Sequence, residues 1–288
     1  MKKLRYLLVI GQLVGIATFA QVPMRHFMQG TNTIPHQIPY GNNAKAGKYA
    51  QTADAKIYYE VYGKGQTIVL LHGGLFGSTI EMASFIDSLS KSFQVVAIST
   101  RGHGKSEIGS STLTLEQRAK DVLTVINQVT NEKVMIIGFS DGGYTAYKFA
   151  SLFPDRTNKL VVIGAGILYP GLREFNMNVS QALSFDTAYW NQQIALMPEP
   201  KRLDEVFKQI ANCYNKLTVG KELLGSIKCP VLVMAGDRDE SNSVQNVLNA
   251  ALLISNHQLS IIPNAGHPAF LENFAAAWSS IVPFFKKQ

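Results

Sequence analysis

Apolar residues along this chain gather in short β-branched runs that alternate with stretches of helical spacing. Runs of four to six apolar residues between Gly, Pro or polar residues are typical of strands buried on both faces of a sheet. About eight strands are expected, at 49–52, 56–62, 67–71, 93–98, 133–137, 159–163, 230–235 and 259–262. The first two read as a hairpin with alternating faces. Helices are expected at 115–129, 144–150, 244–254 and 270–285, with Thr114 capping the first. Strands that alternate with helices predict a mostly parallel sheet covered by helices on both faces.

The first twenty residues have the order of a signal peptide. A basic start is followed by an apolar stretch at 6–19 and by small residues up to Ala20. A membrane anchor is the alternative, but spanning a bilayer takes roughly 20 apolar residues, and no Cys follows for a lipoprotein anchor. Cleavage after Ala20 and export to the periplasm or medium are expected, with membrane contact only through the signal. Residues 21–45 are rich in Gln, Asn, Pro and Gly without periodicity, so they predict an extended arm or linker.

Composition narrows the class of protein. The chain has 288 residues, of which 46% are hydrophobic and 16% charged, enough for one large domain with an inserted lid or for two small domains. Its net charge of +7 falls to +4 without the three basic residues of the signal, and the excess forms no stripe, so nucleic-acid binding is not expected. Export would permit a disulfide between Cys213 and Cys229. Two separate free thiols are favoured, because one Cys lies in a predicted helix and the other opens a strand. Their spacing does not resemble a metal site.

One motif carries the chemistry. Gly138-Phe139-Ser140-Asp141-Gly142-Gly143 stands between the strand at 133–137 and the helix at 144–150. G-x-S-x-G in a strand–turn–helix context is the pattern of a nucleophile elbow, in which the glycines allow a very tight turn and the serine is exposed. Ser140 is therefore the candidate nucleophile.

Two further residue types follow the ends of later strands. The strand at 230–235 leads to Asp237 and Asp239, and the strand at 259–262 leads to His267. A serine hydroxyl needs a neighbouring base, which His267 would supply, and an acid would hold the other ring nitrogen. Ser, Asp and His occur in this order in α/β-hydrolases, unlike in chymotrypsin or subtilisin. Asp239 and its rival Asp237 are the two candidates for this acid.

Other polar groups lie near the predicted site. Backbone N–H groups of Gly74 and Asp141 are expected to form the oxyanion hole. His72 is expected to hydrogen-bond locally and shape its loop. The loop at 101–106 is glycine-rich and basic, which could suggest phosphate binding, but it lacks the P-loop pattern, so a structural role is favoured.

These motifs resemble the α/β-hydrolase fold family over about residue 48 to the C-terminus. The residues that carry the resemblance are His72-Gly73-Gly74, Arg101-Gly102-His103-Gly104-Lys105-Ser106, Gly138 to Gly143, Gly236-Asp237-Arg238-Asp239 and Gly266-His267. The family's usual acid stands three residues after the strand-ending glycine, which is Asp239 here. A proline that often follows four residues later is replaced by Ser243. Ser140 is unlike haloalkane dehalogenases and epoxide hydrolases, whose nucleophile is Asp.

Asp141 is the least usual residue of the motif. In this residue the chain resembles valacyclovir hydrolase and related small esterases, where the matching Asp binds the amino group of an aminoacyl ester. This resemblance implies a substrate-binding role for the Asp141 carboxylate. The alternative is that the side chain only stabilises the start of the helix.

The segment at 169–226 interrupts the alternation of strands and helices. It has helix formers and aromatics but no strand pattern, and it is long for a pair of crossover helices, so it predicts a helical lid over the catalytic end. The expected organisation is a signal at 1–20, an arm at 21–45, a core at 46–168 and 227–288, and this lid. The aromatic side chains Tyr169, Tyr189, Trp190 and Tyr214 could line an acyl pocket or form the core of the lid.

The sequence thus predicts an exported serine hydrolase that cleaves a small carboxylic ester through an acyl-enzyme, without a metal or organic cofactor. Amide, lactone or carbon–carbon bond hydrolysis by the same three residues is the alternative reaction. A non-catalytic protein of the same fold that binds a small ligand is the alternative from another class.

Overall fold

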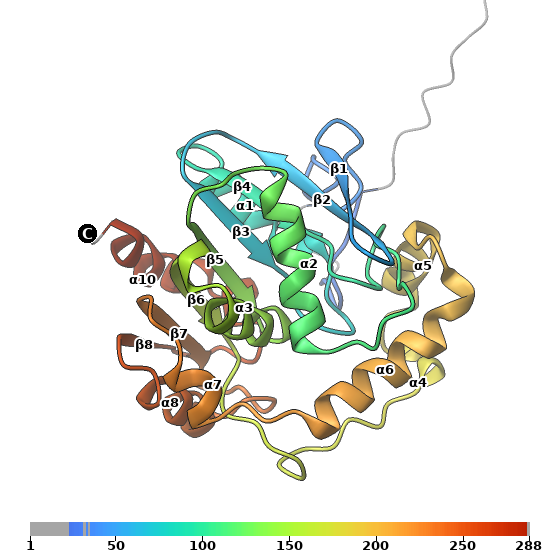
Figure 1. Cartoon of the computed structure of the whole chain (residues 1–288). Helices are drawn as coiled ribbons and strands as arrows, with labels where there is room; N and C mark the ends of the chain where they lie inside the picture. Colours follow the sequence, from blue (N-terminus) through green and yellow to red (C-terminus); the bar gives the residue numbers. More distant parts are fainter. Residues whose placement is uncertain (1–22, 31–32, 34, 287–288) are drawn as a thin grey trace, which may run out of the picture.

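The computed structural model describes residues 23–30, 33 and 35–286, so the predicted signal peptide lies outside the described residues. Eight strands form one sheet in the order β1-β2-β4-β3-β5-β6-β7-β8, which confirms the predicted α/β-hydrolase architecture (Figure 1). The strands are β1 Gly47–Gln51, β2 Lys56–Tyr62, β3 Thr67–Leu71, β4 Gln94–Ile98, β5 Val134–Phe139, β6 Thr157–Ile163, β7 Val231–Gly236 and β8 His257–Ile262.

Strand direction places the carboxyl ends of the central strands at one edge. The predicted hairpin is confirmed, since β1 and β2 are antiparallel with Ala50 opposite Ile57, and β2 is also antiparallel to β4. The pairs from β4 through β3, β5, β6 and β7 to β8 are all parallel. Ligand sites of parallel sheets form beyond these carboxyl ends, because the loops that follow the strands gather there.

Helices cover both faces of the sheet, and each strand contributes alternate residues to two cores. The helices are α1 Ala83–Leu89, α2 Leu115–Asn127, α3 Asp141–Leu152, α4 Val179–Phe185, α5 Thr187–Leu196, α6 Leu203–Lys216, α7 Lys221–Gly225, α8 Val244–Leu252, α9 Ala269–Glu272 and α10 Phe274–Lys286, with short 3₁₀ turns η1 Thr79–Met82, η2 Pro154–Arg156 and η3 Pro200–Arg202. Within β3, Val69 and Leu71 face α2, α3 and α8, whereas Ile68 and Leu70 face α1 and α10. This burial on both faces explains why the central strands read as continuous apolar runs.

Side-chain caps fix two helix ends, one as expected from the sequence and one not. Thr114 caps α2 as expected, because its side chain accepts a hydrogen bond from the Gln117 N–H. The single helix expected at 270–285 is instead split into α9 and α10 at Asn273, whose φ is −143°. The Asn273 side chain accepts a hydrogen bond from the Ala276 N–H, so it caps the second helix where the first has ended.

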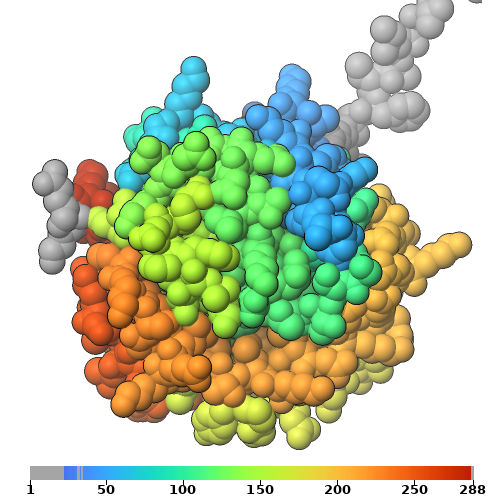
Figure 2. All heavy atoms as spheres, viewed as in Figure 1, coloured from blue at the N-terminus to red at the C-terminus, as the bar shows by residue number. Residues whose placement is uncertain are grey.

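The segment from 169 to 226, here called the lid segment, holds α4, α5, η3, α6 and α7. Figure 1 shows α4, α5 and α6 grouped on one side of the sheet, and Figure 2 shows these yellow and orange segments packed against the rest of the chain. They enclose a third apolar cluster that includes Trp190, Phe207 and Ile210 of the segment and Leu75 of the core. The lid segment is therefore fixed to the sheet by apolar contacts.

The described residues of the arm expected at 21–45 form turns and bends rather than helices or strands, and several of their side chains contact the core. Tyr40 is buried and its hydroxyl donates a hydrogen bond to Asp87. The Gly41 N–H donates to the Glu60 carboxylate at 2.9 Å. Met24 is also buried, in the apolar core that contains α1 and α10.

Cys213 and Cys229 are both free, and burial raises the pKa of each thiol. In the part of the chain that the structure describes, no helix is long and apolar enough to cross a bilayer.

Candidate active site

Ser140 lies at the turn between β5 and α3, in a conformation that few residues adopt. Its φ is 50° and its ψ is −112°, outside the allowed regions for most side chains. The Ser140 N–H donates a hydrogen bond to the Ile163 carbonyl at the end of β6, at 2.8 Å, which helps to hold the turn. Backbone strain of this kind persists only where the surroundings fix it, and it is frequent at catalytic residues.

The glycines of the motif are required by close backbone contacts. A Cβ atom on Gly138 would lie 2.3 Å from the Gly142 carbonyl oxygen, and one on Gly142 would lie 2.3 Å from the Leu71 carbonyl oxygen. Any side chain at either position would push β5, α3 and β3 apart. The sequence therefore forms this sharp turn because both flanking positions lack a Cβ.

Ser140 begins a chain of hydrogen-bonded side chains. Its Oγ is 2.9 Å from Nε2 of His267, and Nδ1 of the same ring is 2.8 Å from Oδ2 of Asp239. The other carboxylate oxygen of Asp239 accepts the N–H groups of Ser241 and Asn242 at 2.8 and 2.7 Å. These two bonds fix the orientation of the Asp239 carboxylate, which in turn fixes the imidazole.

The structure distinguishes the two candidate acids. Asp237 is exposed and accepts the Ala265 N–H at 3.0 Å, a bond within the loops after β7 and β8. Hydrogen bonds from backbone N–H groups lower the pKa of its carboxyl group. Asp239, in contrast, is buried and faces His267.

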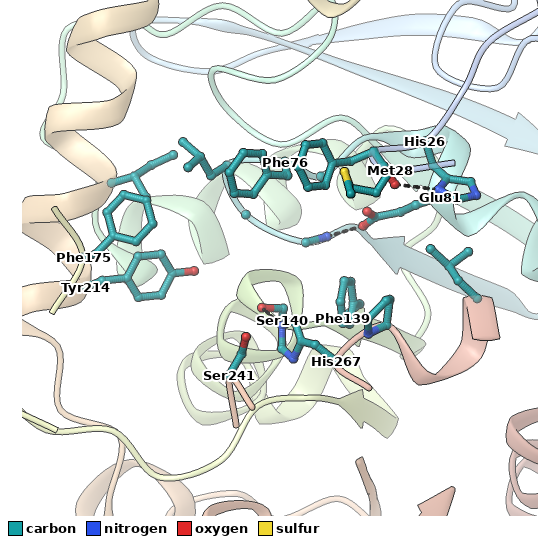
Figure 3. Close-up of a pocket in the computed structure, with 18 of the residues that line it drawn as sticks. His26, Met28, Phe76, Glu81, Phe139, Ser140, Phe175, Tyr214, Ser241 and His267 are labelled. Carbon is teal, nitrogen blue, oxygen red and sulfur yellow. Dashed lines mark hydrogen bonds between the residues drawn. The ribbon is translucent and has the colours of Figure 1, made fainter. Parts of the chain in front are cut away.

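A cavity of about 470 Å³ opens in front of Ser140 and His267, a volume suited to a small organic molecule. Its wall comes from three parts of the chain: the core loops, the lid segment and the arm (Figure 3). Most of the side chains are apolar, with Phe76 and Phe139 from the core and Phe175 and Tyr214 from the lid segment. In Figure 3, Phe175 and Tyr214 lie on one side of Ser140, and Met28 and Glu81 lie on the other.

Comparison with known proteins agrees with this geometry. The sequence family described as the alpha/beta hydrolase fold matches residues 66–196, which include β3, the elbow and part of the lid segment. The chain has the α/β-hydrolase fold. This assignment places the elbow, the sheet order and the inserted helices in one known architecture.

Its relatives are enzymes. The serine hydrolase BPHL of Homo sapiens is 26% identical over 215 residues, covering 69% of this chain and 72% of the relative. The 2-hydroxy-6-oxo-6-(2'-aminophenyl)hexa-2,4-dienoic acid hydrolase of Metapseudomonas resinovorans is 25% identical and covers 80% and 88%. We conclude that this α/β-hydrolase-fold protein is a hydrolase.

Solved structures share the fold. A meta-cleavage product hydrolase from Pseudomonas fluorescens IP01 superposes with a TM-score of 0.71 at 19% identity, covering 84% of this chain and 98% of its own. The enol-lactonase from Burkholderia xenovorans LB400 gives a TM-score of 0.68 at 22% identity and covers 83% and 100%.

The two predicted oxyanion donors lie side by side. Asp141 is the first residue of α3, where N–H groups have no acceptor within the helix. A Cβ atom on Gly74 would lie 2.9 Å from the Cβ of Asp141, so the two backbones approach closely. Gly74 lines the cavity together with Ser140. Their role in binding an oxyanion stays a prediction.

The carboxylate of Asp141 is not placed for the substrate-binding role that the resemblance implied. It is fully buried, forms an ion pair with Arg118 of α2 and accepts a hydrogen bond from the Tyr214 hydroxyl. It is absent from the described residues that line the cavity. Neither the amine-binding role nor a simple helix-start role describes this arrangement, in which a buried cation already neutralises the carboxylate.

The loop after β3 is held by two buried titratable groups. Burial lowers the pKa of His72 to about 3, so the ring is neutral at physiological pH. Its Nε2 accepts the Thr100 N–H at 3.0 Å, and its Nδ1 is 2.7 Å from the Gly73 carbonyl oxygen, which confirms the expected structural role. The Gly73 N–H donates to Glu81, whose pKa burial raises to about 8.

The basic loop after β4 also has a structural role, as expected. The Arg101 side chain is buried and forms ion pairs with Asp121 and Asp54 at 2.8 and 3.0 Å. Its guanidinium is therefore saturated by carboxylates and is not available to bind phosphate.

The lid aromatics separate into three environments. Tyr189 and Trp190 are buried in the lid core, Tyr214 lines the cavity, and Tyr169 is half exposed. Of these four, Tyr214 is therefore the one placed to contact a molecule in the cavity, where it lies with Phe175 of the same segment.

Several cavity residues were not predicted from the sequence. His26, Phe27 and Met28 come from the arm, and Glu81 comes from η1. The apolar pair Phe27-Met28 within a polar stretch was the available signal for the arm, whereas no local pattern marks Glu81. Within the described residues, no cluster of three His, Cys, Asp or Glu side chains could hold a metal ion.

Proposed function

We propose that this hydrolase cleaves small, largely apolar carboxylic esters, with Ser140 as nucleophile, His267 as general base and acid, and Asp239 as the residue that orients His267. The hydrogen-bonded series Ser140 Oγ–His267 Nε2 and His267 Nδ1–Asp239 Oδ2, opening into an apolar cavity, is the observation that supports this function. The relation to serine hydrolases supports it further.

In the first half of the reaction, Ser140 Oγ attacks the ester carbonyl carbon while its proton moves to Nε2 of His267. The C–O bond to the alcohol then breaks, and the same proton passes to the leaving oxygen. Asp239 keeps the other ring proton on Nδ1 and stabilises the imidazolium that forms. In the second half, His267 takes a proton from water, the hydroxide attacks the acyl-enzyme, and Ser140 regains its proton as the acid leaves.

Charge develops on the carbonyl oxygen in both halves. The N–H groups of Gly74 and Asp141 are proposed to bind that oxygen, since preorganised donors are most effective where the charge appears. The N-terminal end of α3 adds the positive end of a helix dipole at the same place.

The cavity favours uncharged groups on both sides of the scissile bond. Its wall is largely aromatic and aliphatic; among the described lining residues, Arg173 is the one Arg or Lys, and Glu81 and Glu174 are the acidic ones. The Arg173 guanidinium lies over the Tyr214 ring at 5.7 Å, and its Nη1 donates to the Ser241 carbonyl at 2.9 Å. A small ester with apolar acyl and alcohol groups fits this wall better than a dicarboxylate.

The test uses the mature chain and two probes. A fluorophosphonate should label wild type at Ser140 and leave Ser140→Ala unlabelled, and a panel of p-nitrophenyl esters should be hydrolysed. Labelling without turnover of any ester would redirect the search to other acyl compounds. Absence of both in folded protein contradicts the proposed function.

Cleavage of a carbon–carbon bond in a 2-hydroxy-6-oxo-dienoate is the second candidate. It is favoured by the relatives and solved structures named as hydrolases of such compounds. The discriminating measurement is the ratio of kcat/KM for a chromogenic dienoate and for an ester of similar size.

We also propose that the enzyme is exported after cleavage of residues 1–20. The basic start, apolar stretch and small residues up to Ala20 support this proposal.

A further inference from the structure

The arm forms part of the cavity wall. His26, Phe27 and Met28 line the cavity together with core and lid residues. The Phe27 ring stacks on Phe76 with ring centres 4.2 Å apart and an interplanar angle of 19°, and it meets the edge of Tyr189 at 5.6 Å. A segment that precedes the sheet by some twenty residues therefore contacts both the loop after β3 and the lid segment.

One carboxylate of the lid segment fixes the arm in this position. Oδ2 of Asp186 accepts the Arg25 guanidinium at 2.8 Å and the Met28 N–H at 2.9 Å. Its other oxygen accepts the Tyr189 N–H at 3.0 Å and thereby caps α5. Gln192 of α5 adds two more bonds, since it accepts the Arg25 N–H and donates to the Pro23 carbonyl.

The Arg25–Asp186 ion pair is largely shielded from solvent. The Asp186 side chain is only 7% exposed and the Arg25 side chain 29%, so solvent screens this pair less than it screens an exposed one. The same carboxylate thus joins the start of α5 to the arm, and the two sides of the cavity wall are held together.

The arm lies outside the residues of the family match, which begins at residue 66. The arm is therefore a place where the specificity of this chain can differ within a common architecture.

We propose that residues 25–28 form a specificity wall, which limits the length of the apolar group that an ester can place beside Phe27, and that the Arg25–Asp186 ion pair holds this wall in place. The proposal rests on the proposed ester hydrolysis at Ser140 and adds which group is selected. The part of the ester that lies beside Phe27 should be uncharged. Burial raises the pKa of Glu81 and lowers the pKa of His26, so the neutral form of both neighbouring side chains is favoured. Short, uncharged acyl or alcohol groups are the class that this wall admits.

The experiment measures kcat and KM for p-nitrophenyl esters from acetate to octanoate. Phe27→Ala should shift the preference toward the longer esters by about tenfold, mainly through a lower KM, since the change adds room for several methylenes. Arg25→Ala should shift it in the same direction by a smaller factor, because Asp186 can still cap α5. Arg25→Lys should restore part of the wild-type profile.

Ile38→Ala is the matched control. It shortens an apolar side chain in the same arm that is 38% exposed and outside the described cavity lining. Its profile should equal that of wild type, and circular dichroism should show that all variants are folded. A chain-length profile unchanged in both Phe27→Ala and Arg25→Ala, with esters still hydrolysed, would overturn the proposal.

Equilibrium binding of Nile red, a neutral apolar dye, separates this proposal from the proposed function. It requires no chemistry at Ser140. If wild type hydrolyses no ester and takes no fluorophosphonate, ester hydrolysis is wrong, and the wall is then judged by the dye alone. Phe27→Ala should change the dye's affinity severalfold and Ile38→Ala should not; equal affinities in all three proteins overturn the specificity wall.

Discussion

Arg118 and Asp141 form a buried ion pair directly behind the proposed nucleophile. The two side chains are 1% and 0% exposed, and Arg118 comes from α2 whereas Asp141 begins α3. The Tyr214 hydroxyl donates to the same carboxylate, which connects α6 of the lid segment to the residue after Ser140. This pair explains why an acidic residue is tolerated beside a nucleophile whose reaction creates negative charge.

Asp141→Asn should destabilise the protein by about 3–5 kcal/mol, because it leaves the Arg118 charge buried without its partner. Urea unfolding measures the loss. Glu116→Gln is the control: it removes an exposed carboxylate paired with Lys120 and should have a far smaller effect. In the same preparations, kcat/KM for an α-aminoacyl ester and for its des-amino analogue should be similar in wild type. A strong preference for the amine that Asp141→Asn abolishes would restore the amine-binding role.

Ser140→Ala and His267→Ala should each lower kcat by roughly four to six orders of magnitude, since residues that act as a unit lose nearly the whole rate when one is removed. Ester turnover and circular dichroism are measured together. Because both side chains face the cavity, the fold should be kept. Near-normal turnover in a folded variant of either kind would exclude the proposed mechanism.

The two acids at the end of β7 should differ sharply. Asp239→Asn should lower kcat by about 10⁴-fold, because the amide stabilises the wrong tautomer of His267. Asp237→Asn should leave kcat near that of wild type, because Asp237 is exposed and bonds to the Ala265 backbone rather than to His267. Steady-state kinetics on the two variants decides; a reversed order would move the orienting role to Asp237.

Glu81 should make stability depend on pH. Its pKa is raised from 4.5 to about 8 in the folded protein by burial. The folded state therefore binds more protons than the unfolded state between these values, and stability should fall as pH rises from about 5 to 8, by a total on the order of 4 kcal/mol. Urea unfolding measured at several pH values across this range should show that the stability of Glu81→Gln falls less with pH than that of wild type, because the Gln side-chain carbonyl can still accept the Gly73 N–H. An equal fall of stability with pH in both proteins would mean that Glu81 titrates normally.

Export predicts a defined N-terminus. Protein recovered from its native host should begin at or near Gln21, because the order of basic, apolar and small residues ends at Ala20. N-terminal sequencing of the mature protein measures this. Recovery of Met1 in a membrane fraction would instead indicate an uncleaved anchor. Cleavage at this point leaves Arg25 and Phe27 in the enzyme.

The backbone around the site could be predicted from the residue pattern. Apolar runs gave the strands of the sheet, and the spacing of Gly138, Ser140 and Gly142 gave the elbow, because a turn this tight depends on which neighbouring residues lack a Cβ. The apolar runs also placed Ser140, Asp239 and His267 just beyond the ends of strands. Backbone geometry over five or six residues is set by sterics within that stretch, so it can be read locally.

The partners of the side chains, in contrast, depend on how distant segments pack. Asp141 pairs with Arg118 from another helix, Asp239 rather than Asp237 reaches His267, and Phe27 stacks on Phe76 across 49 positions of sequence. The helix expected at 270–285 divides at Asn273 for a similar reason, since a side-chain cap competes there with the helical pattern. A buried charged side chain needs a partner, and an aromatic side chain packs against the groups around it. Which groups these are depends on how distant segments of the chain meet, not on the neighbouring residues in sequence.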